Sequence, residues 1–371
     1  MLLTACSSSD DTSTAVQNGI GLSNGWNLGN TLDACSYGNK NNLGLDTENS
    51  WGMPTTTQKM IQEVAAKGFK SIRVPVSWHN HITDASYKID STWMNRVKTI
   101  VDWSLNAGLR VIINIHHDNL KESEMNTTYG FCVPTNANSS LKTQSIAYIT
   151  AIWTQVSEAF ASYDERLVFE LLNEPRCRGT SYEWNGGSYL ATANKIICEY
   201  EQMCLNVIRA SGGNNAVRYV MVAPYAASPG ATNGWSMPTD ATAGRLIVSM
   251  HAYTPYSFAM SDDTVKTFTQ TGDIDYLFNN QLNTWVKKGY PVVVGEMSAT
   301  DKANTSERLK WFQYYCGKAK ENSIPVILWD NMTMAKESGG QGDIKSGECH
   351  GYFNRNTLSW YFPTLVAVMV Q

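Results

Sequence analysis

Short apolar runs alternate with longer amphipathic segments along most of the chain. The short runs are rich in valine and isoleucine, and their length and β-branched side chains favour strands over helices. We expect strands at residues 26–29, 71–76, 111–115, 167–172, 219–222, 246–250, 292–295 and 325–329.

Helical patterns fill most of the intervals between these strands. We expect helices at residues 56–67, 91–107, 141–162, 190–210, 274–288 and 306–322, with a closing helix at 364–370. Gly68, Gly108 and Gly289 each follow such a segment, as C-terminal capping glycines do. Strands that alternate with helices imply a parallel sheet, and eight such units predict an α/β fold, the closed (β/α)8 TIM barrel. Residues 226–244 show no clear helical pattern and depart from this repeat.

The first fifteen residues differ from the rest of the chain. Leu3 to Cys6 resembles a bacterial lipobox, and the polar residues 7–15 would form a flexible tether. A signal peptide normally has a basic region and about 7–15 apolar residues before its cleavage site, and only Met1 and Leu2 precede the motif here. Two interpretations stay open, a lipid anchor at Cys6 or a short tail that matches by chance. We therefore expect a lipoprotein-like tail at 1–15 and one barrel domain at 16–371, secreted or at the outer cell surface.

Composition excludes several classes of protein. The chain is 43% hydrophobic and 17% charged, so it is not disordered. With 29 basic and 33 acidic residues, its net charge of −4 provides no electrostatic footprint for nucleic acid. No run of 18 apolar residues predicts a membrane span. The eight cysteines include no CxxC pair, which argues against zinc ribbons and leaves disulfide pairing open.

The chain is rich in aromatic residues, with 12 tryptophans and 18 tyrosines. Their flat apolar faces and polar edges match the faces of sugar rings, which favours carbohydrate binding. A large core is the other explanation for this content.

Polar side chains follow most of the predicted strands. In a TIM barrel the C-terminal ends of the strands form one rim, where catalytic groups gather. The groups expected there are Asn30, His116, His117, Asp118, Asn173, Glu174, His251, Tyr253, Glu296, Trp329, Asp330 and Asn331. Ordinary loop polarity does not account well for so many acids, imidazoles, amides and aromatic rings on one rim.

Glu174 and Glu296 form the most informative pair. Glycoside hydrolysis needs one carboxylic acid to protonate the leaving oxygen and a second carboxylate to attack the anomeric carbon or to activate water. Two neighbouring carboxylates also raise the pKa of one of them, which we expect to keep the acid protonated. For each glutamate taken alone, a solvated loop residue is an equally good explanation.

Arg73 lies within a predicted strand and supports this interpretation. If it points into the barrel, its buried guanidinium needs a partner, for which Glu296 and Glu170 are candidates. A pairing with Glu296 would keep that carboxylate ionised, as a nucleophile requires. The alternative is that Arg73 only braces the barrel with Glu170.

Three other motifs could support different chemistry. In His116-His117-Asp118, adjacent strand residues point to opposite faces, so that only two could reach one metal ion. The G-x-S-x-G sequence at 21–25 precedes the first strand, whereas a nucleophile elbow follows one. The glycine-rich residues 338–342 lack the Lys-Ser/Thr of a phosphate-binding loop. We expect neither a metal nor a cofactor.

Taken in order, these motifs resemble glycoside hydrolase family 5, whose members are retaining β-glycanases with a (β/α)8 barrel. The resemblance covers nearly the whole chain. Its blocks are residues 25–34, 72–75, 114–118, 169–176, 251–253, 294–296 and 329–331. The block at 47–52 is similar to that of subfamily 4, whose members cleave cellulose-type, mixed-linkage and xyloglucan chains. Met297-Ser298 departs from the Phe-Gly of many relatives.

The resemblance implies a role for each matching residue. Glu174 corresponds to the acid/base, Glu296 to the nucleophile, and Asn173 to the residue that binds the sugar 2-hydroxyl. Arg73, His116, His251 and Tyr253 correspond to supports of the −1 subsite and Trp329 to its stacking platform. Asn30 and His117 resemble further contacts to the glycone.

The resulting expectation is a retaining endo-β-1,4-glucanase that acts on polysaccharide, with its two carboxyl groups about 5–5.5 Å apart. A β-mannanase of the same family and a non-catalytic glycan-binding lipoprotein are the alternatives. The choice between linear glucan and xyloglucan depends on the loops near Trp51, Trp184 and Trp235. We expect no nucleic-acid partner, membrane contact only through Cys6, and a monomer.

Overall fold

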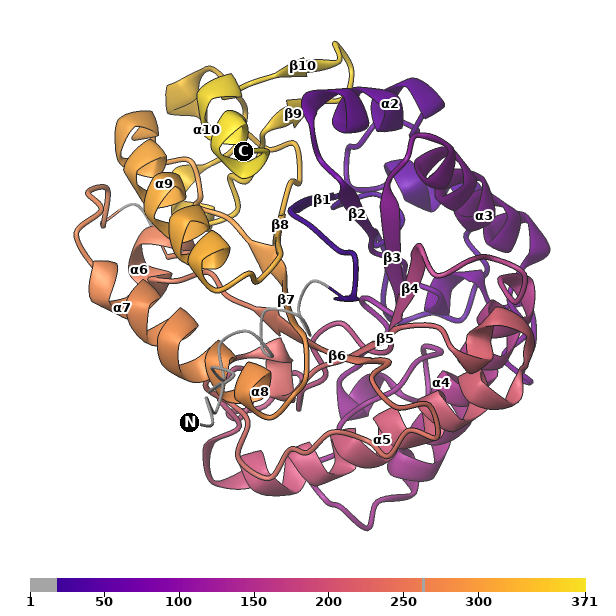
Figure 1. Ribbon diagram of the computed structural model, residues 1–371. Coiled ribbons are helices and arrows are strands. Elements are labelled where there is room, and N and C mark those ends of the chain that lie inside the picture. The colour runs from indigo at the N-terminus through magenta and orange to yellow at the C-terminus, as the bar shows by residue number, and fades with distance from the viewer. Residues whose placement is uncertain (1–18, 262–263) are drawn as a thin grey trace, which may run out of the picture.

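The computed structural model describes residues 19–261 and 264–371, so that the predicted tail and Cys6 lie outside the described residues. Eight parallel strands close into a barrel in sequence order, because β8 pairs with β1 (Figure 1). The strands are β1 (Gly25–Asn27), β2 (Ser71–Val74), β3 (Arg110–Asn114), β4 (Leu167–Glu170), β5 (Val220–Val222), β6 (Leu246–His251), β7 (Val292–Met297) and β8 (Val326–Leu328). The predicted (β/α)8 barrel is confirmed.

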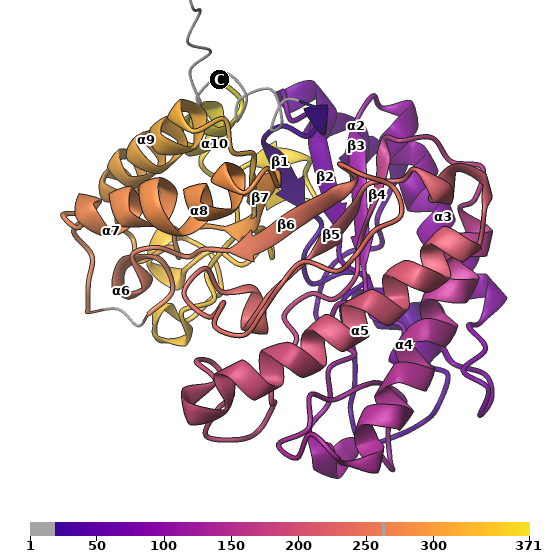
Figure 2. The same ribbon diagram turned by 60° about the horizontal axis from the view of Figure 1, so that its bottom comes forward.

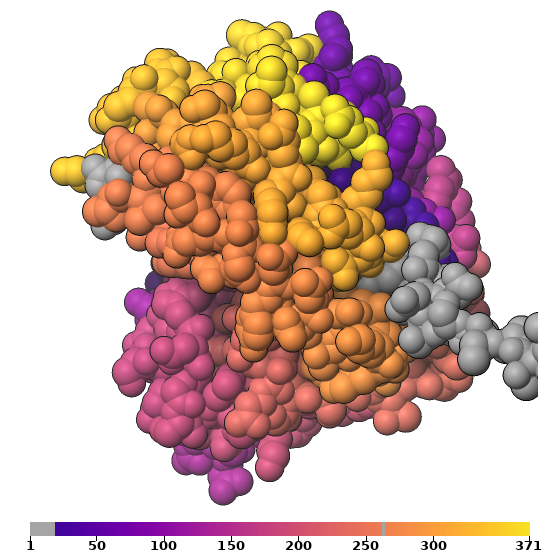
Figure 3. All heavy atoms as spheres, turned by 60° about the vertical axis from the view of Figure 1, so that its left-hand side comes forward, coloured from indigo at the N-terminus to yellow at the C-terminus, as the bar shows by residue number. Residues whose placement is uncertain are grey.

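Helices surround the strands on the outside (Figures 1 and 2). They are α2 (Gln58–Lys67), α3 (Ser91–Asn106), α4 (Ser140–Ala159), α5 (Leu190–Ala210), α6 (Tyr256–Ala259), α7 (Thr271–Tyr276), α8 (Asn283–Lys287), α9 (Thr305–Glu321) and α10 (Pro363–Met369). Figure 2 shows α4 and α5 side by side, and Figure 3 shows the outer layer from the side of α7 and α9. The hairpin of β9 (Phe353–Asn354) and β10 (Ser359–Trp360) precedes α10, which confirms the expected closing helix.

Two helical segments differ from the sequence pattern. The single helix expected at 274–288 is interrupted by a π-helix at Leu277–Leu282, which joins α7 to α8. Among the described residues between β5 and β6 there is no α-helix, only a 3-10 turn at Tyr225–Ala227. The two strands still pair in parallel, with Val220 opposite Leu246, so the barrel closes without this helix.

Local signals explain where several helices begin and end. Asp90 accepts hydrogen bonds from the backbone amides of Thr92 and Trp93, which caps the start of α3. Gly68 follows α2 with a φ of 119°, a conformation that side chains with a Cβ rarely adopt.

The barrel interior has two layers of different chemistry. The apolar layer contains Ile20, Leu22, Ile112, Val168, Tyr219, Met221, Ile247, Val293 and Ile327. The polar layer contains Asn27, Arg73, Asn114, Glu170 and Ser249, all of them buried. Asn27, Asn114 and Glu170 are each the last residue of a strand, so this layer lies toward the rim where the active site is expected.

The remaining expectations concern cysteines and the membrane. The seven described cysteines are free thiols, so none of the disulfides left open above is formed among them. Of the helices that the structure describes, none is long and apolar enough to cross a membrane.

Candidate active site

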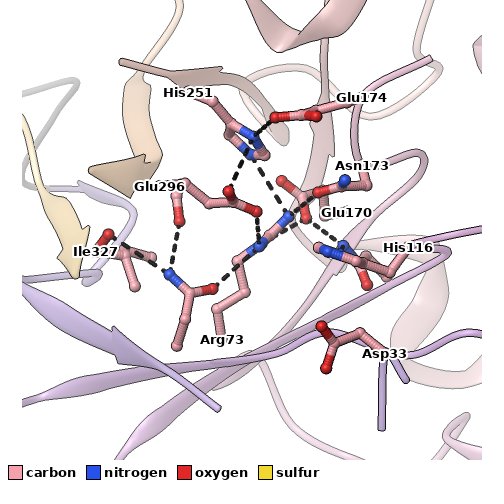
Figure 4. Close-up of polar contacts among 12 residues, drawn as sticks. Asp33, Arg73, His116, Glu170, Asn173, Glu174, His251, Glu296 and Ile327 are labelled. Atoms are coloured by element: carbon pink, nitrogen blue, oxygen red, sulfur yellow. Dashed lines mark hydrogen bonds and ion pairs between the residues drawn. The ribbon is translucent and has the colours of Figure 1, made fainter. Parts of the chain in front are cut away.

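Arg73 lies at the centre of the polar layer and has no exposed surface. Its guanidinium donates hydrogen bonds to Glu170 (Nε to Oε2, 2.7 Å), Glu296 (Nη1 to Oε1, 2.7 Å), Asn27 (Nη1 to Oδ1, 3.0 Å) and Asn173 (Nη2 to Oδ1, 2.6 Å) (Figure 4). Both partners proposed from the sequence are therefore correct. Arg73 reaches a substrate only through these residues, because the carboxylates and Asn173 cover it.

Glu296 extends from β7 and lies almost fully buried in this network. Besides the ion pair with Arg73, its Oε2 accepts a hydrogen bond of 2.9 Å from the Tyr253 hydroxyl. Donors to both oxygens orient the carboxylate and stabilise its negative charge. This arrangement suits a group that has to act as an anion.

Glu174 lies beyond the end of β4, and 18% of its side chain is exposed. Its Oε1 is 2.8 Å from His251 Nδ1, and its Oε2 is 3.5 Å from Arg176 Nη1. One oxygen of Glu174, one oxygen of Glu296 and a ring nitrogen of His251 all lie within 4.8 Å of one another. The two carboxylates therefore face each other across a short gap, with His251 beside both (Figure 4).

The pKa values of this group differ from the expected order. Burial favours the neutral form of Glu174, but the hydrogen bond from His251 and the charges of His251 and Arg176 outweigh it and lower the pKa to about 2. Burial raises the pKa of Glu296, although His251, Arg73 and Tyr253 oppose the rise. The pair does raise the pKa of one carboxylate, that of Glu296, but the prediction that it keeps the acid Glu174 protonated is wrong, because His251 stabilises the Glu174 anion.

His251 lies between the two carboxylates, which changes its pKa. Burial alone would lower its pKa, but the charges of Glu296 and Glu174 and the hydrogen bond to Glu174 together raise it. A proton on Nδ1 then lies in a 2.8 Å hydrogen bond to the partly exposed carboxylate of Glu174. The pair of His251 and Glu174 therefore shares one proton close to the nucleophile.

A second group of side chains forms the wall beside this centre. The ring of His116 is stacked parallel to that of Trp329, with centroids 5.9 Å apart, and contacts His117 edge-on. Trp51, 38% exposed, contacts His117 on the outer side. The wall is therefore an aromatic surface that runs from the buried centre to the solvent.

The histidines of this wall are neutral. Burial and neighbouring positive charges lower the pKa of His116 well below its usual value and that of His117 to about 3. The Asn114 amide donates a hydrogen bond of 3.1 Å to His116 Nδ1, so that Nε2 carries the proton. His116 is thus a hydrogen-bond donor that suits a sugar hydroxyl better than a metal ion.

Strand alternation did not describe the histidine motif correctly. β3 ends at Asn114, so alternation no longer applies to His116 and His117, and both have ligand atoms within 4.8 Å of Asp33. Asp118, the third residue of the motif, instead accepts hydrogen bonds from the Trp78 amide and the Tyr148 hydroxyl. Two residues of the motif therefore come together, as expected, but they are the adjacent His116 and His117.

The other predicted residues have clear positions. Trp329, 8% exposed, follows β8. Asn30 follows β1 with a φ of 57°, and its backbone amide donates to Asp33. Asn331 is not part of the centre, because its side chain bonds to the backbone of Glu348 and His350.

Sequence reasoning missed two members of the polar layer. Asn27 accepts from Arg73 and donates to the Gly295 carbonyl, next to the nucleophile. Ser249 donates a hydrogen bond of 2.6 Å to Glu170. Their signal was available, since each is a polar residue inside an otherwise apolar strand.

Comparison with known proteins identifies the family. Residues 35–334 match the model of the cellulase family, glycosyl hydrolase family 5. The chain belongs to glycoside hydrolase family 5. This family 5 chain is 39% identical over 358 residues to Endoglucanase A of Clostridium longisporum, in a match that covers 94% of this chain and 63% of that protein. The chain thus spans less than two thirds of the length of that relative.

Solved structures are similar over nearly the whole family 5 domain. A structure described as a GH5-4 broad-specificity endoglucanase from Ruminococcus champanellensis with bound cellotriose has 39% identity and a TM-score of 0.84, and the match covers 96% of this chain and 98% of that one. A GH5 xyloglucan-specific endo-β-1,4-glucanase from a metagenomic library, in complex with cellotriose, has 33% identity and a TM-score of 0.82, with 96% and 99% covered.

Proposed function

We propose that this family 5 chain is a retaining endo-β-1,4-glucanase that uses Glu296 as nucleophile and Glu174 as acid and base. The carboxylate separation carries the proposal. Retaining glycosidases have carboxyl groups about 5–5.5 Å apart, whereas inverting ones leave about 6.5–9.5 Å for a water molecule. One oxygen of Glu174 and one oxygen of Glu296 lie within 4.8 Å of each other, which agrees with the shorter separation of retaining enzymes.

The reaction proceeds in two displacements. In the first, a lone pair of Glu296 forms a bond to C1 while the bond from C1 to the leaving oxygen breaks and Glu174 delivers a proton to that oxygen. His251, 2.8 Å away, supplies Glu174 with the proton. In the second, Glu174 takes a proton from water and returns it to His251, the water oxygen bonds to C1, and Glu296 leaves as the carboxylate.

The surrounding side chains bind the sugar that is attacked. Arg73 keeps Glu296 and Asn173 in place, and Asn173 presents its amide beside the nucleophile. Trp329 and His116 provide a flat wall and a hydrogen-bond donor for one sugar ring. Since this wall extends through His117 to Trp51, we propose that a chain of several glucose units lies along it.

The substrates proposed are β-1,4-linked glucans, namely cellulose-type chains, mixed-linkage glucan and xyloglucan. The similar solved structures support this range, because they include broad-specificity and xyloglucan-specific endoglucanases. Trp51 and Trp184 are the exposed tryptophans of the described chain, so that both are open to contact with a polymer.

The test compares four soluble polysaccharides side by side by reducing-sugar release, with Glu296→Gln as the inactive control. We expect cleavage of carboxymethyl cellulose, mixed-linkage glucan and xyloglucan, and proton NMR should show the β-anomer as the first product. Activity on mannan alone would make the enzyme a β-mannanase. Binding without cleavage would make it a glycan-binding protein, and a first product in the α-form would contradict retention.

We also propose that the protein acts outside the cytoplasm and is anchored by a lipid on Cys6. The lipobox-like residues 3–6 and the polar tether at 7–15 support this, as does a polymeric substrate that cannot cross a membrane. With the full reading frame expressed in bacteria that are fed labelled palmitate, we expect label in the wild type and none in Cys6→Ser. An unlabelled, freely soluble wild type would contradict the anchor.

A further inference from the structure

A groove lies at the end of the barrel where the strands begin, opposite the catalytic rim. It has a volume of about 680 Å³, and it is bordered by the residues that precede β1, β2 and β8 and by parts of α9 and α10. Pockets that bind small ligands have volumes of about 300–1,000 Å³. The groove is therefore large enough for a ligand of that size, and neither catalytic carboxylate lines it.

Two lysines give this groove a positive charge. Lys70 precedes β2 and Lys320 lies in the last turn of α9, and both residues are exposed. No acidic side chain is among the residues described as lining the groove, and within 19–261 and 264–371 neither lysine forms an ion pair. An anionic group could therefore bind between the two lysines without displacing a partner that they already have.

Apolar side chains line the groove alongside the lysines. They are Leu22, Ile324, Val368, Met369 and Val370, of which the two valines are partly exposed. A lysine side chain also has an apolar stem below its charged end. A ligand that carries a phosphate next to a hydrocarbon chain matches both kinds of surface.

The groove adjoins the beginning of the described chain. The Gly19 carbonyl accepts a hydrogen bond of 3.0 Å from the Tyr219 hydroxyl, and the following Leu22 belongs both to the apolar layer of the barrel and to the lining of the groove. Gly19 follows Cys6 by 13 positions, a length of chain that spans at most about 45 Å. A lipid on Cys6, as proposed above, would keep this end of the barrel within that distance of a membrane.

The same end of the barrel has further lysines without an acidic partner. α8 ends at Lys287, and Lys288 follows it, and neither of these exposed residues forms an ion pair within the part of the chain that the structure describes. Asp240, an acid at this end, is paired with Arg209 at 2.7 Å. The C-terminal ends of the helices lie here, where positive charges are favoured. This end of the barrel is therefore suited to an anionic surface.

We propose that the groove binds the headgroup of an anionic phospholipid, with the phosphate between Lys70 and Lys320. The inference goes beyond the proposed glucanase activity and adds a membrane contact to the one expected through Cys6. A weak contact is sufficient when a tether keeps the two surfaces close together. Bound in this way, the barrel has its strand starts on the lipid, and the rim with Glu174 and Glu296 faces away from the membrane, toward the polysaccharide.

The test is cosedimentation of the protein with sucrose-loaded vesicles. The full chain carries Cys6→Ser, so that no acyl group takes part. We expect binding to vesicles of phosphatidylcholine with phosphatidylglycerol, release by salt, and no binding to phosphatidylcholine alone. Lys70→Gln together with Lys320→Gln should weaken binding about 10- to 30-fold. As a control, Lys336→Gln together with Lys345→Gln removes the same charge from the segment after β8, at the opposite end of the barrel, and should change binding by less than about twofold.

A further variant separates the groove from the general charge of this end of the barrel. Gly317 lines the groove, and a Cβ at this position would meet no atom within 4 Å, so Gly317→Gln places a side chain in the groove and keeps both lysines. We expect Gly317→Gln to weaken binding to the anionic vesicles about fivefold.

Hydrolysis of soluble glucan, which all of these variants should retain at the level of the parent protein, shows that each variant is folded. Equal binding to both kinds of vesicle would overturn the proposed lipid site, as would folded lysine or Gly317→Gln variants that bind like the parent. Those outcomes would leave the glucanase proposal intact, whereas a parent protein that binds the anionic vesicles and hydrolyses no glucan would refute the glucanase proposal alone.

Discussion

The two catalytic carboxylates are held in opposite ways. Glu296 extends from a strand, is 7% exposed and meets Arg73 and Tyr253 at hydrogen-bond distance. Glu174 lies beyond its strand, is 18% exposed and contacts His251 and Arg176. The contacts of Glu296 hold its carboxylate in place within the barrel. The position of Glu174 instead leaves one of its carboxylate oxygens accessible for proton exchange. The difference follows the chemistry, because a nucleophile keeps its charge until it attacks and an acid has to regain its proton in every cycle.

The largest effect is expected at the nucleophile. Glu296→Gln keeps the shape of the side chain but replaces the attacking carboxylate with a neutral, weakly nucleophilic amide, so we expect kcat on mixed-linkage glucan to fall by about five orders of magnitude or more. Binding of cellotetraose, measured by calorimetry, should persist. Residual activity of a few per cent would show that another group attacks C1.

Glu174→Ala should have a smaller effect that depends on the leaving group. General acid–base catalysis contributes about 10²- to 10⁴-fold, and we expect losses in that range on glucan. On nitrophenyl cellobioside the first displacement needs little acid, so the glycosyl-enzyme should accumulate and appear as a burst of nitrophenol. Added azide, which attacks C1 without a base, should restore turnover and yield a β-glycosyl azide. No rescue by azide would contradict the role of Glu174.

Arg73→Met tests the rigid side of the comparison. It leaves Glu170 and Glu296 buried without their cation, and breaking a buried pair in this way costs about 3–5 kcal/mol of unfolding free energy. Arg166→Met removes the exposed pair with Asp164 and should cost at most about 1 kcal/mol. Urea titrations of both variants measure the difference. Equal losses of unfolding free energy in the two variants would show that the ion pairs of Arg73 do not stabilise the barrel.

His251→Gln should narrow the pH profile of kcat/KM from both sides. The basic limb reflects loss of the proton shared by His251 and Glu174. The pKa of the His251 imidazole is raised, so without this imidazole the proton is lost at lower pH and the basic limb moves to lower pH. The acid limb reflects protonation of Glu296, whose pKa His251 lowers, so this limb should move to higher pH. His117→Asn is the control, because the pKa of His117 is about 3 and its loss should not move the basic limb. If both limbs of the pH profile of His251→Gln lay where they do in the wild type, His251 and Glu174 would not share a proton.

The strands and the residues at the rim could be predicted because each is indicated by residues that are neighbours in the sequence. Short apolar runs marked all eight strands, seven of them with valine or isoleucine, and the polar residues after the runs marked Glu174, His251 and Glu296. The pairing of Arg73 with Glu170 and Glu296 followed from its charge, since a buried guanidinium needs partners.

The parts that could not be predicted depend on contacts between distant segments. The low pKa of Glu174 comes from His251, 77 positions away, and from Arg176, whose orientation depends on Glu183 and Trp184. The packing of His117 against Asp33 required knowledge of where β3 ends.

The most direct test of the account is to trap the covalent intermediate. A 2-deoxy-2-fluoro-cellobioside with a good leaving group slows the second displacement more than the first, and mass spectrometry of the digested protein locates the attached sugar. We predict one fluorocellobiosyl group per protein, attached to the peptide that contains Glu296, and none in Glu296→Gln. A label on Glu174, or a fully hydrolysed reagent that leaves no labelled protein and an α-product, would contradict double displacement through Glu296.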